Sequence, residues 1–163
     1  MTRTITLERI FQATIEEVWA LWTTKEGFES WWGPEGFTTT VREVDVRVGG
    51  ELVYAMTATA PAQVDFMKKA GMPLTTEQRI GYTAVDPHRR LAYASLADFI
   101  PGVVPYDVAT LVEFHPNAQG VRMVVTIDAM HDEPWTRMAV AGWESQLGRL
   151  VDLLAERQRA TGR

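Results

Sequence analysis

The strongest constraint on the fold is a long amphipathic pattern near the C-terminus. Between residues 132 and 158 apolar side chains recur at spacings of three and four, which place them on one stripe of an α-helix. They are Trp135, Met138, Ala139, Trp143, Leu147, Leu150, Val151 and Leu154. Asp132 is a candidate N-cap, and Pro134 suits the first helical turn. At 1.5 Å per residue this helix is about 38 Å long, so it needs an apolar partner surface of similar length.

Most of the remaining chain alternates apolar and polar residues with the period of two that is typical of β-strands. We predict strands at residues 3–11, 37–48, 51–58, 79–85, 91–99, 108–114 and 121–130. A capping box of Thr14 and Glu17 predicts a helix of about ten residues that ends near Gly27. Gly49-Gly50 predicts a two-residue hairpin turn. Antiparallel strands followed by one long helix predict an α+β fold, with a curved sheet wrapped around the C-terminal helix.

Length, charge and cysteine content exclude several classes of protein. At 163 residues the chain fits a single domain, residues 1–163. Its net charge of −5 and pI near 5.2 argue against a nucleic-acid partner, because nucleic-acid-binding proteins carry a basic patch. Without cysteine, the chain cannot form disulfides, use a thiolate or hold zinc through sulfur. The sequence has no run of about 20 apolar residues and no signal-peptide core, so we expect a cytoplasmic protein without a membrane span.

Two segments interrupt the strand pattern. Residues 60–78 contain Pro61 and Pro73 around a short helical piece at 63–70, and we interpret them as a lid-like insertion, with a long connection between strands as the alternative. Residues 99–106 are unusually apolar for a connection. Methionine and aromatic side chains in such loops suit the mouth of a ligand site, but exposed apolar surface is also typical of a contact between protein chains. A homodimer therefore stays open as an alternative.

Four sequence motifs occur in a fixed order along the chain. They are T-I-E-E-V-W, W-W-G-P, D-V-R-V-G-G-E-L-V-Y and G-W-E-S-Q-L-G-R-L. From about Thr4 to Leu154 they resemble the family named after the activator of heat shock protein 90 ATPase, within the START-like, or SRPBCC, superfamily. The resemblance implies a helix-grip fold, in which a curved antiparallel sheet folds over a long C-terminal helix and encloses a cavity. It also implies kinship with uncharacterised bacterial proteins, with lipid and sterol carriers and with polyketide cyclases.

The face of the predicted sheet that looks at the helix is aromatic and apolar with a few hydroxyls, as small-molecule pockets are. Tyr54, Tyr82 and Tyr93 are the strongest candidates for a ligand contact, because buried hydroxyls need partners. Of the adjacent tryptophans at 31 and 32, one ring is expected to face the cavity mouth and the other to close the core. The predicted ligand-binding residues are Trp31, Trp32, Phe37, Tyr54, Met56, Phe66, Tyr82, Tyr93, Phe114, Met123 and Trp143. Core packing alone would also explain the deepest of them.

The sequence carries no recognisable catalytic or metal signature. Its three histidines, His88, His115 and His131, lack the spacing of a zinc site, and the common nucleophile, phosphate-loop and dinucleotide fingerprints are absent. We therefore predict no metal, no cofactor and no catalytic residue. The leading hypothesis is that a small hydrophobic or amphipathic molecule binds between sheet and helix. A cyclase-like or hydrolase-like enzyme using His131 or Asp98, and a chaperone-activator-like or stress-related interaction domain, are the alternatives.

Overall fold

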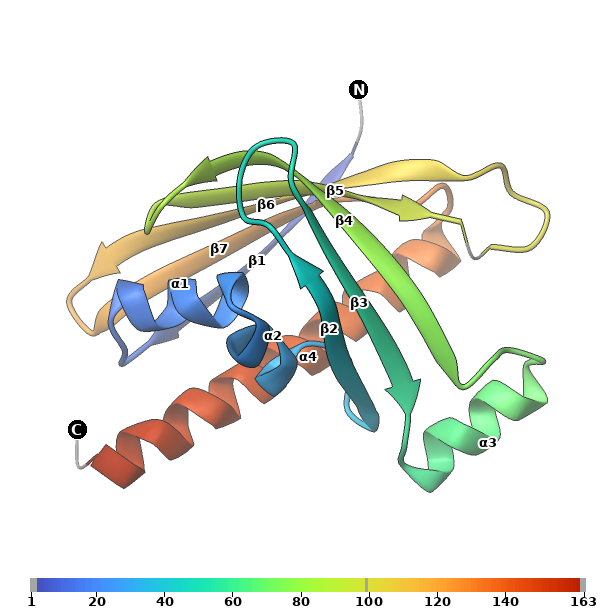
Figure 1. The fold of residues 1–163 in the computed structure, drawn as a ribbon, viewed down its shortest axis with the longest axis horizontal. Coiled ribbons are helices and arrows are strands. Elements are labelled where there is room, and N and C mark those ends of the chain that lie inside the picture. The colour runs from blue at the N-terminus through green and yellow to red at the C-terminus, as the bar shows by residue number, and fades with distance from the viewer. Residues whose placement is uncertain (1–2, 99, 162–163) are drawn as a thin grey trace.

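The structure is a computed structural model that describes residues 3–98 and 100–161 (Figure 1). Its elements follow the chain in the order β1 (Thr4–Phe11), α1 (Ile15–Thr23), α2 (Lys25–Trp31), β2 (Phe37–Val44), β3 (Glu51–Ala58), α3 (Pro61–Lys69), β4 (Thr75–Asp86), β5 (Arg90–Ala97), β6 (Tyr106–Asn117), β7 (Gly120–Asp128) and α4 (Glu133–Thr161). Phe99, the last residue of one predicted strand, lies outside the described residues. The predicted α+β class is confirmed.

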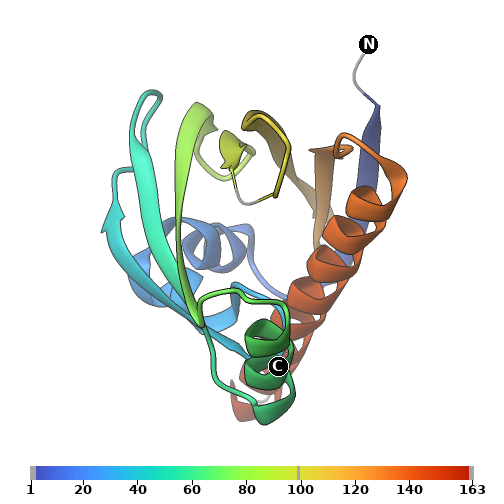
Figure 2. The same cartoon turned by 90° about the vertical axis from the view of Figure 1, so that its right-hand side faces the viewer.

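The seven strands of the described chain form one antiparallel sheet in the order β1-β7-β6-β5-β4-β3-β2. The first strand pairs with the last, from Thr4 opposite Asp128 to Phe11 opposite Val121. Figure 2 shows the sheet as a curved wall with α4 along its open side. This is the predicted helix-grip arrangement. Within the described residues no helix is both long and apolar enough to cross a membrane.

The long helix α4 begins where the sequence predicts. The Asp132 carboxylate accepts a hydrogen bond from the Trp135 backbone N–H at 2.9 Å, which caps the helix. Leu147, Leu150 and Leu154 are buried in the same apolar cluster as the inner face of the sheet. Its N-terminal half packs less tightly, and Met138 there is 55% exposed. The predicted stripe is therefore one helix with two different environments.

A second helix, α2, stands where the sequence predicts that the first helix ends. Thr24 caps it by accepting a hydrogen bond from the Gly27 N–H at 3.0 Å. Gly27 does not end a helix, contrary to the prediction. A Cβ at this position would lie 2.4 Å from the Ala20 carbonyl oxygen. Glycine is present because α1 and α2 approach each other closely, which the one-dimensional pattern does not reveal.

The connection between β2 and β3 is longer than the predicted two-residue hairpin. Residues 45–50 all lie between the two strands. Gly49 has a positive φ of 86°, and a Cβ at Gly50 would lie 2.1 Å from the Asp45 carbonyl oxygen. Both glycines are therefore needed, but for a wider turn. The turn is fixed to the sheet, because the Gly49 N–H donates to the Tyr82 carbonyl at 3.0 Å.

The edge strand β2 is covered at one point by an ion pair from α2. The Val41 N–H donates to the Glu29 carboxylate at 2.6 Å, and the Val41 carbonyl accepts from the Lys25 ammonium at 3.1 Å. Lys25 and Glu29 also contact each other at 2.6 Å. The Lys25 ammonium, followed by the Val41 N–H, lowers the pKa of the Glu29 carboxyl. Both backbone groups of Val41 are thus occupied by charged side chains.

Ion pairs fasten one side of α4 to the first strand and the first helix. Arg3 pairs with Glu133, Arg9 with Glu144, and Arg157 with Glu17 at 3.5 Å. Each pair is at least partly exposed, so each contributes little to stability. Together they place that side of α4 along the β1 edge of the sheet.

Replacing Gly27 with alanine should destabilise the fold although alanine is the better helix former. The added Cβ would overlap the Ala20 carbonyl, and overpacking of this kind costs about 1–3 kcal/mol. At Gly148 of α4 an added Cβ meets no atom within 4 Å, so the matched change Gly148→Ala should stabilise by about 0.5–1 kcal/mol. Urea unfolding followed by circular dichroism measures both. Equal effects at the two positions would contradict the role assigned to Gly27.

Candidate ligand-binding cavity

A cavity of about 400 Å³ lies between the concave face of the sheet and the N-terminal half of α4. This volume is within the range of small-molecule sites. Most of its wall is apolar, with a few hydroxyls and amides. The helix contributes Trp135, Met138, Ala139, Gly142, Trp143 and Gln146 to it. Their spacing puts them on one face of α4, so the helix forms one wall and the sheet the other.

The cavity opens to solvent between the 60–78 segment, the end of β5 and the start of α4. Met72, Leu96 and Met138 all line it and are 37%, 44% and 55% exposed. Met67 of α3 reaches the cavity from the same segment and is buried. The 60–78 segment therefore forms part of the wall near the opening.

Methionine is concentrated in this wall. Of the chain's seven methionines, Met56, Met67, Met72, Met130 and Met138 line the cavity. A thioether side chain is flexible and contacts aromatic rings favourably. The wall can therefore adjust to the shape of what it encloses.

The structure brings six of the eleven predicted ligand residues to the cavity. They are Trp32, Phe37, Tyr54, Met56, Tyr93 and Trp143. The two adjacent tryptophans take different positions because α2 ends between them, although their rings stay in edge-to-face contact with 5.3 Å between centroids. The Trp31 ring is fully buried in the core, and its indole N–H donates to the Leu21 carbonyl at 2.8 Å. The Trp32 ring lines the cavity and stacks on Phe28, with 4.5 Å between ring centroids.

The other predicted residues, besides Trp31, do not line the cavity. Phe114 packs edge-to-face on Trp19, and the Met123 sulfur accepts a hydrogen bond from the Trp22 indole at 3.3 Å. Both belong to the core. Phe66 is 61% exposed, because its neighbour Met67 takes the inward position on α3. Tyr82 is buried beside Tyr93 but behind the cavity wall.

Sequence reasoning missed most of the α4 wall. A signal was present, because the apolar stripe changes composition along the helix. Its first half holds tryptophan, methionine, alanine and glycine, whereas its second half holds leucine. Bulky aliphatic side chains fill a core. Small residues such as alanine and glycine leave space unfilled, and flexible methionine side chains adapt to the space that remains. The change marks the boundary between core and cavity near Gln146.

Two tyrosine hydroxyls in this region are buried without a hydrogen-bond partner among the described residues. They belong to Tyr82 and Tyr93, which face each other across β4 and β5. Burial raises the pKa of Tyr93 well above its usual range, and the neighbouring Tyr54 and Tyr82 add to this, whereas the Thr110 side chain, close to the hydroxyl but outside good hydrogen-bond geometry, acts in the opposite direction. Burial also raises the pKa of Tyr54 to about 12. These phenols therefore stay neutral at physiological pH.

Charged groups are scarce in the wall. Asp128 is the one charged side chain among the described lining residues, and its Oδ2 already accepts the Ala109 N–H at 3.0 Å. Nor do the described parts of the chain contain a group of three His, Cys, Asp or Glu side chains suited to a metal ion. The arrangement can enclose and orient an apolar molecule, and it offers little for acid–base chemistry.

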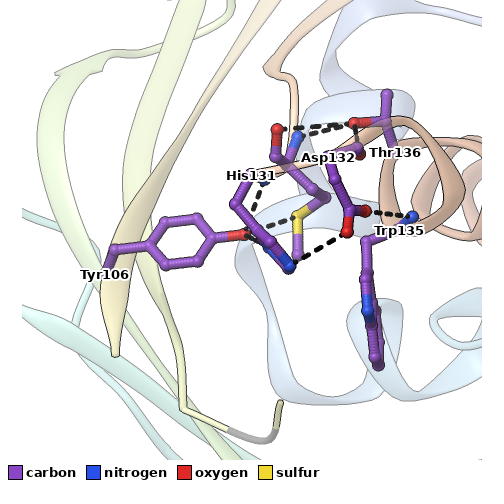
Figure 3. Close-up of polar contacts among 6 residues, drawn as sticks. Tyr106, His131, Asp132, Trp135 and Thr136 are labelled. Atoms are coloured by element: carbon purple, nitrogen blue, oxygen red, sulfur yellow. Dashed lines mark hydrogen bonds and ion pairs between the residues drawn. The ribbon is translucent and has the colours of Figure 1, made fainter. Parts of the chain in front are cut away.

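His131 lies at the junction between β7 and α4, as Figure 3 shows. The Tyr106 hydroxyl lies 2.9 Å from its Nδ1 and accepts the His131 backbone N–H at 3.1 Å. Asp132 Oδ2 is 3.4 Å from its Nε2. Neither Tyr106 nor His131 lines the cavity. The imidazole holds the junction together, with both ring nitrogens facing neighbouring side chains.

Arg149 of α4 fixes the turn that carries Trp32. Its Nη1 donates to the carbonyls of Trp32, Gly33, Pro34 and Phe37, the shortest contact being 2.9 Å to Gly33. Burial lowers the pKa of the guanidinium, yet the cluster of carbonyl dipoles favours the charged form. The Gln146 amide oxygen adds a contact by accepting the Gly33 N–H at 3.2 Å. The turn and the helix therefore form one unit that positions this part of the cavity wall.

The sequence matches the family described as "Activator of Hsp90 ATPase homolog 1-like protein" over residues 12–155. The chain belongs to this family. Among curated protein sequences none matches this chain.

Solved structures agree with membership of the AHSA1-like family. The fold is similar to that of protein CV1439 from Chromobacterium violaceum, with a TM-score of 0.74, 25% identity and coverage of 93% of this chain and 96% of that one. It is also similar to the AHSA1-like protein from Aeromonas hydrophila, with a TM-score of 0.69, 22% identity and coverage of 98% and 94%. A third similar structure is that of Ms6760 from Mycobacterium smegmatis. Its TM-score is 0.72 and its identity 21%, with coverage of 96% of this chain and 93% of that one. The AHSA1-like fold therefore extends over nearly the whole chain.

Replacing Arg149 with methionine should loosen the turn, because several carbonyl oxygens lose their donor. We expect a loss of about 2 kcal/mol in the free energy of unfolding, and a red shift of tryptophan emission as Trp32 gains contact with water. Arg157→Met on the same helix removes only a partly exposed ion pair with Glu17 and should cost less than about 1 kcal/mol. Similar losses in both variants would contradict the role given to Arg149.

Alkaline pH should weaken folding through Tyr54. In the unfolded chain its phenol titrates near pH 10, whereas its folded pKa is about 12. Between these values the folded state keeps a proton that the unfolded state loses, so the stability from this group is full below pH 10 and is lost toward pH 12. The slope is about 1 kcal/mol per pH unit. The melting temperature should therefore fall more steeply between pH 10 and pH 12 for wild type than for Tyr54→Phe. Parallel curves of melting temperature against pH would refute the effect.

Proposed function

We propose that this protein binds a small hydrophobic or amphipathic molecule in the cavity between the sheet and α4. The observation that carries the proposal is an apolar space of about 400 Å³ between the sheet and α4, next to a continuous cluster of buried apolar side chains. Protein interiors are normally filled by side chains. Here Ala139 and Gly142 stand at wall positions where larger residues would close the space. Small residues at these positions support a cavity that is kept open for a ligand.

The composition of the wall supports binding over catalysis. A general acid or base must lie within hydrogen-bond reach of the reacting group. Besides tyrosines that stay protonated, the described wall offers only Asp128, whose carboxylate is engaged by the Ala109 N–H. His131 and Asp98, which the enzyme hypothesis would use, are not among the lining residues. The helix-grip fold of the AHSA1-like family is itself commonly a ligand-binding fold.

Substituting leucine for Gly142 should weaken ligand binding without harming the fold. A Cβ at Gly142 meets no atom within 4 Å, so the leucine can extend into the cavity, and leucine is the better helix former by roughly 0.8 kcal/mol. The uncharged fluorescent probe N-phenyl-1-naphthylamine should bind the variant at least about tenfold more weakly than wild type, in line with the loss of its apolar contact area.

The matched control is Gly148→Leu. It lies on the same helix, also has open space around an added Cβ, and does not line the cavity. We expect wild-type probe affinity in this variant and thermal stability no lower than wild type in both. If Gly142→Leu binds the probe as tightly as Gly148→Leu does, the cavity is not the binding site. If wild type itself binds no apolar probe, the proposed function fails.

A further inference from the structure

Two uncharged polar side chains on the concave face of the sheet point into the cavity. They are Gln78 of β4 and Ser95 of β5, and both line it. Burial alternates along β4, and Gln78 lies on the same face as the buried Ile80. Its neighbours Glu77 and Arg79 lie on the outer face, where each forms an ion pair. Ser95 is directly opposite Ile80 in the sheet, so Gln78 and Ser95 are diagonal neighbours on one face.

Neither of these side chains holds the fold together through a hydrogen bond. No other described residue bonds to the Gln78 amide or to the Ser95 hydroxyl. Both residues are half-buried, so their polar atoms can still bond to water. An apolar residue at either position would continue the apolar wall. The two polar groups are therefore available to a molecule inside the cavity.

A ligand that fills the cavity changes the surroundings of both polar groups. It displaces the water to which they can bond, and a polar group that loses water without gaining another partner is unfavourable. The glutamine amide can donate and accept hydrogen bonds, and so can the serine hydroxyl. A ligand that brings a polar group to Gln78 and Ser95 replaces the lost bonds, whereas a pure hydrocarbon does not.

The opposite wall of the cavity has a different chemistry. Figure 2 shows α4 and β4 on opposite sides of the molecule's open interior. Toward the cavity α4 presents mainly aromatic, aliphatic and small residues, among them Trp135, Met138 and Trp143. The amide oxygen of Gln146, the polar residue of this wall, already accepts the Gly33 N–H. A bound molecule therefore meets hydrogen-bonding groups on the sheet side and an apolar surface on the helix side.

The wall is unsuited to a polar group that carries a charge. Within the described chain its lining residues include no lysine, arginine or histidine, so an anion gains no counter-ion. The acidic residue Asp128 already uses its Oδ2 to accept the Ala109 N–H. An ionised group would lose its hydration here without adequate compensation. Neutral hydrogen-bonding groups fit this wall better than ionised ones.

We propose that the cavity selects an uncharged amphipathic molecule whose hydroxyl or amide group bonds to Gln78 and Ser95 while its apolar side lies against α4. This inference rests on the proposed function. It adds to that function a chemical class of ligand and two residues that determine specificity.

Four naphthalene compounds that share one ring system test the proposal by displacing N-phenyl-1-naphthylamine from the protein. They are 2-(naphthalen-2-yl)ethanol, the hydrocarbon 2-ethylnaphthalene, the anion of naphthalen-2-ylacetic acid, and the ammonium ion of 2-(naphthalen-2-yl)ethylamine. The wild-type protein should bind the alcohol at least about tenfold more tightly than either ion, because neither charge is compensated in the cavity.

The decisive variant is Gln78→Leu, which has a similar size and no polar group. It should weaken binding of the alcohol about fivefold, the effect of one hydrogen bond. It should strengthen binding of the hydrocarbon about twofold or more, because the wall becomes more apolar. Both affinities are measured on the same variant, so a general loss of stability cannot produce these opposite shifts. Ser95→Ala should weaken the alcohol about threefold and leave the hydrocarbon unchanged.

Gln119→Leu is the matched control. Gln119 lies exposed in the turn between β6 and β7 and does not line the cavity, so this variant should keep wild-type affinity for all four compounds. Three results would overturn the selectivity while the proposed function stands: shifts of alcohol and hydrocarbon in the same direction in Gln78→Leu, unchanged alcohol affinity in Ser95→Ala, or an ion that binds wild type as tightly as the alcohol. If neither N-phenyl-1-naphthylamine nor any of the four compounds binds wild type, both proposals fail.

Discussion

A single guanidinium decides how the long helix meets the rest of the fold. Arg149 lies on α4 between the buried Leu147 and Leu150, about one turn after Gln146, the last residue of the helix that lines the cavity. Its Nη1 is shared among backbone carbonyls of the turn after α2. A partly buried cation needs acceptors that replace its lost hydration, so moving the turn away from the helix is unfavourable. That turn carries Trp32 and Phe37 into the wall. The form of the cavity thus depends on a contact made outside it.

The helix serves two purposes with the two ends of one stripe. Leu147, Leu150 and Leu154 are almost completely buried and join α4 to the core. Toward the N-terminus, Gly142 and Ala139 leave room on the same face, and tryptophans and methionines surround it. Residue size along the stripe sets the boundary between packed core and open space. The packed contacts and the cavity wall can therefore change separately, because different turns of the helix form them.

Periodicity was sufficient to predict the strands, the long helix and the α+β class, because each pattern is local and is repeated several times. Features that depend on one close contact were not predictable. Gly27 resembled a helix end, and only the packing of α1 on α2 shows why glycine is needed there. Strand alternation placed Phe114 and Met123 on the correct face, but it cannot tell where along a strand the core gives way to the cavity. Arg149 belongs to the G-W-E-S-Q-L-G-R-L motif, but nothing in the sequence indicates its contacts, since its partners are backbone carbonyls that every residue possesses.

The contacts at Val41 bear on how copies of this protein can meet. Unpaired backbone groups at a sheet edge are the usual template for adding a strand from another molecule. In β2 the Lys25–Glu29 pair already occupies both groups of Val41, so a continuous intermolecular sheet cannot form there while Glu29 is ionised. The lowered pKa of Glu29 keeps that protection in place in mildly acidic solution. Strong acid protonates Glu29 and weakens its bond to the Val41 N–H, so the covering of this edge depends on a charge.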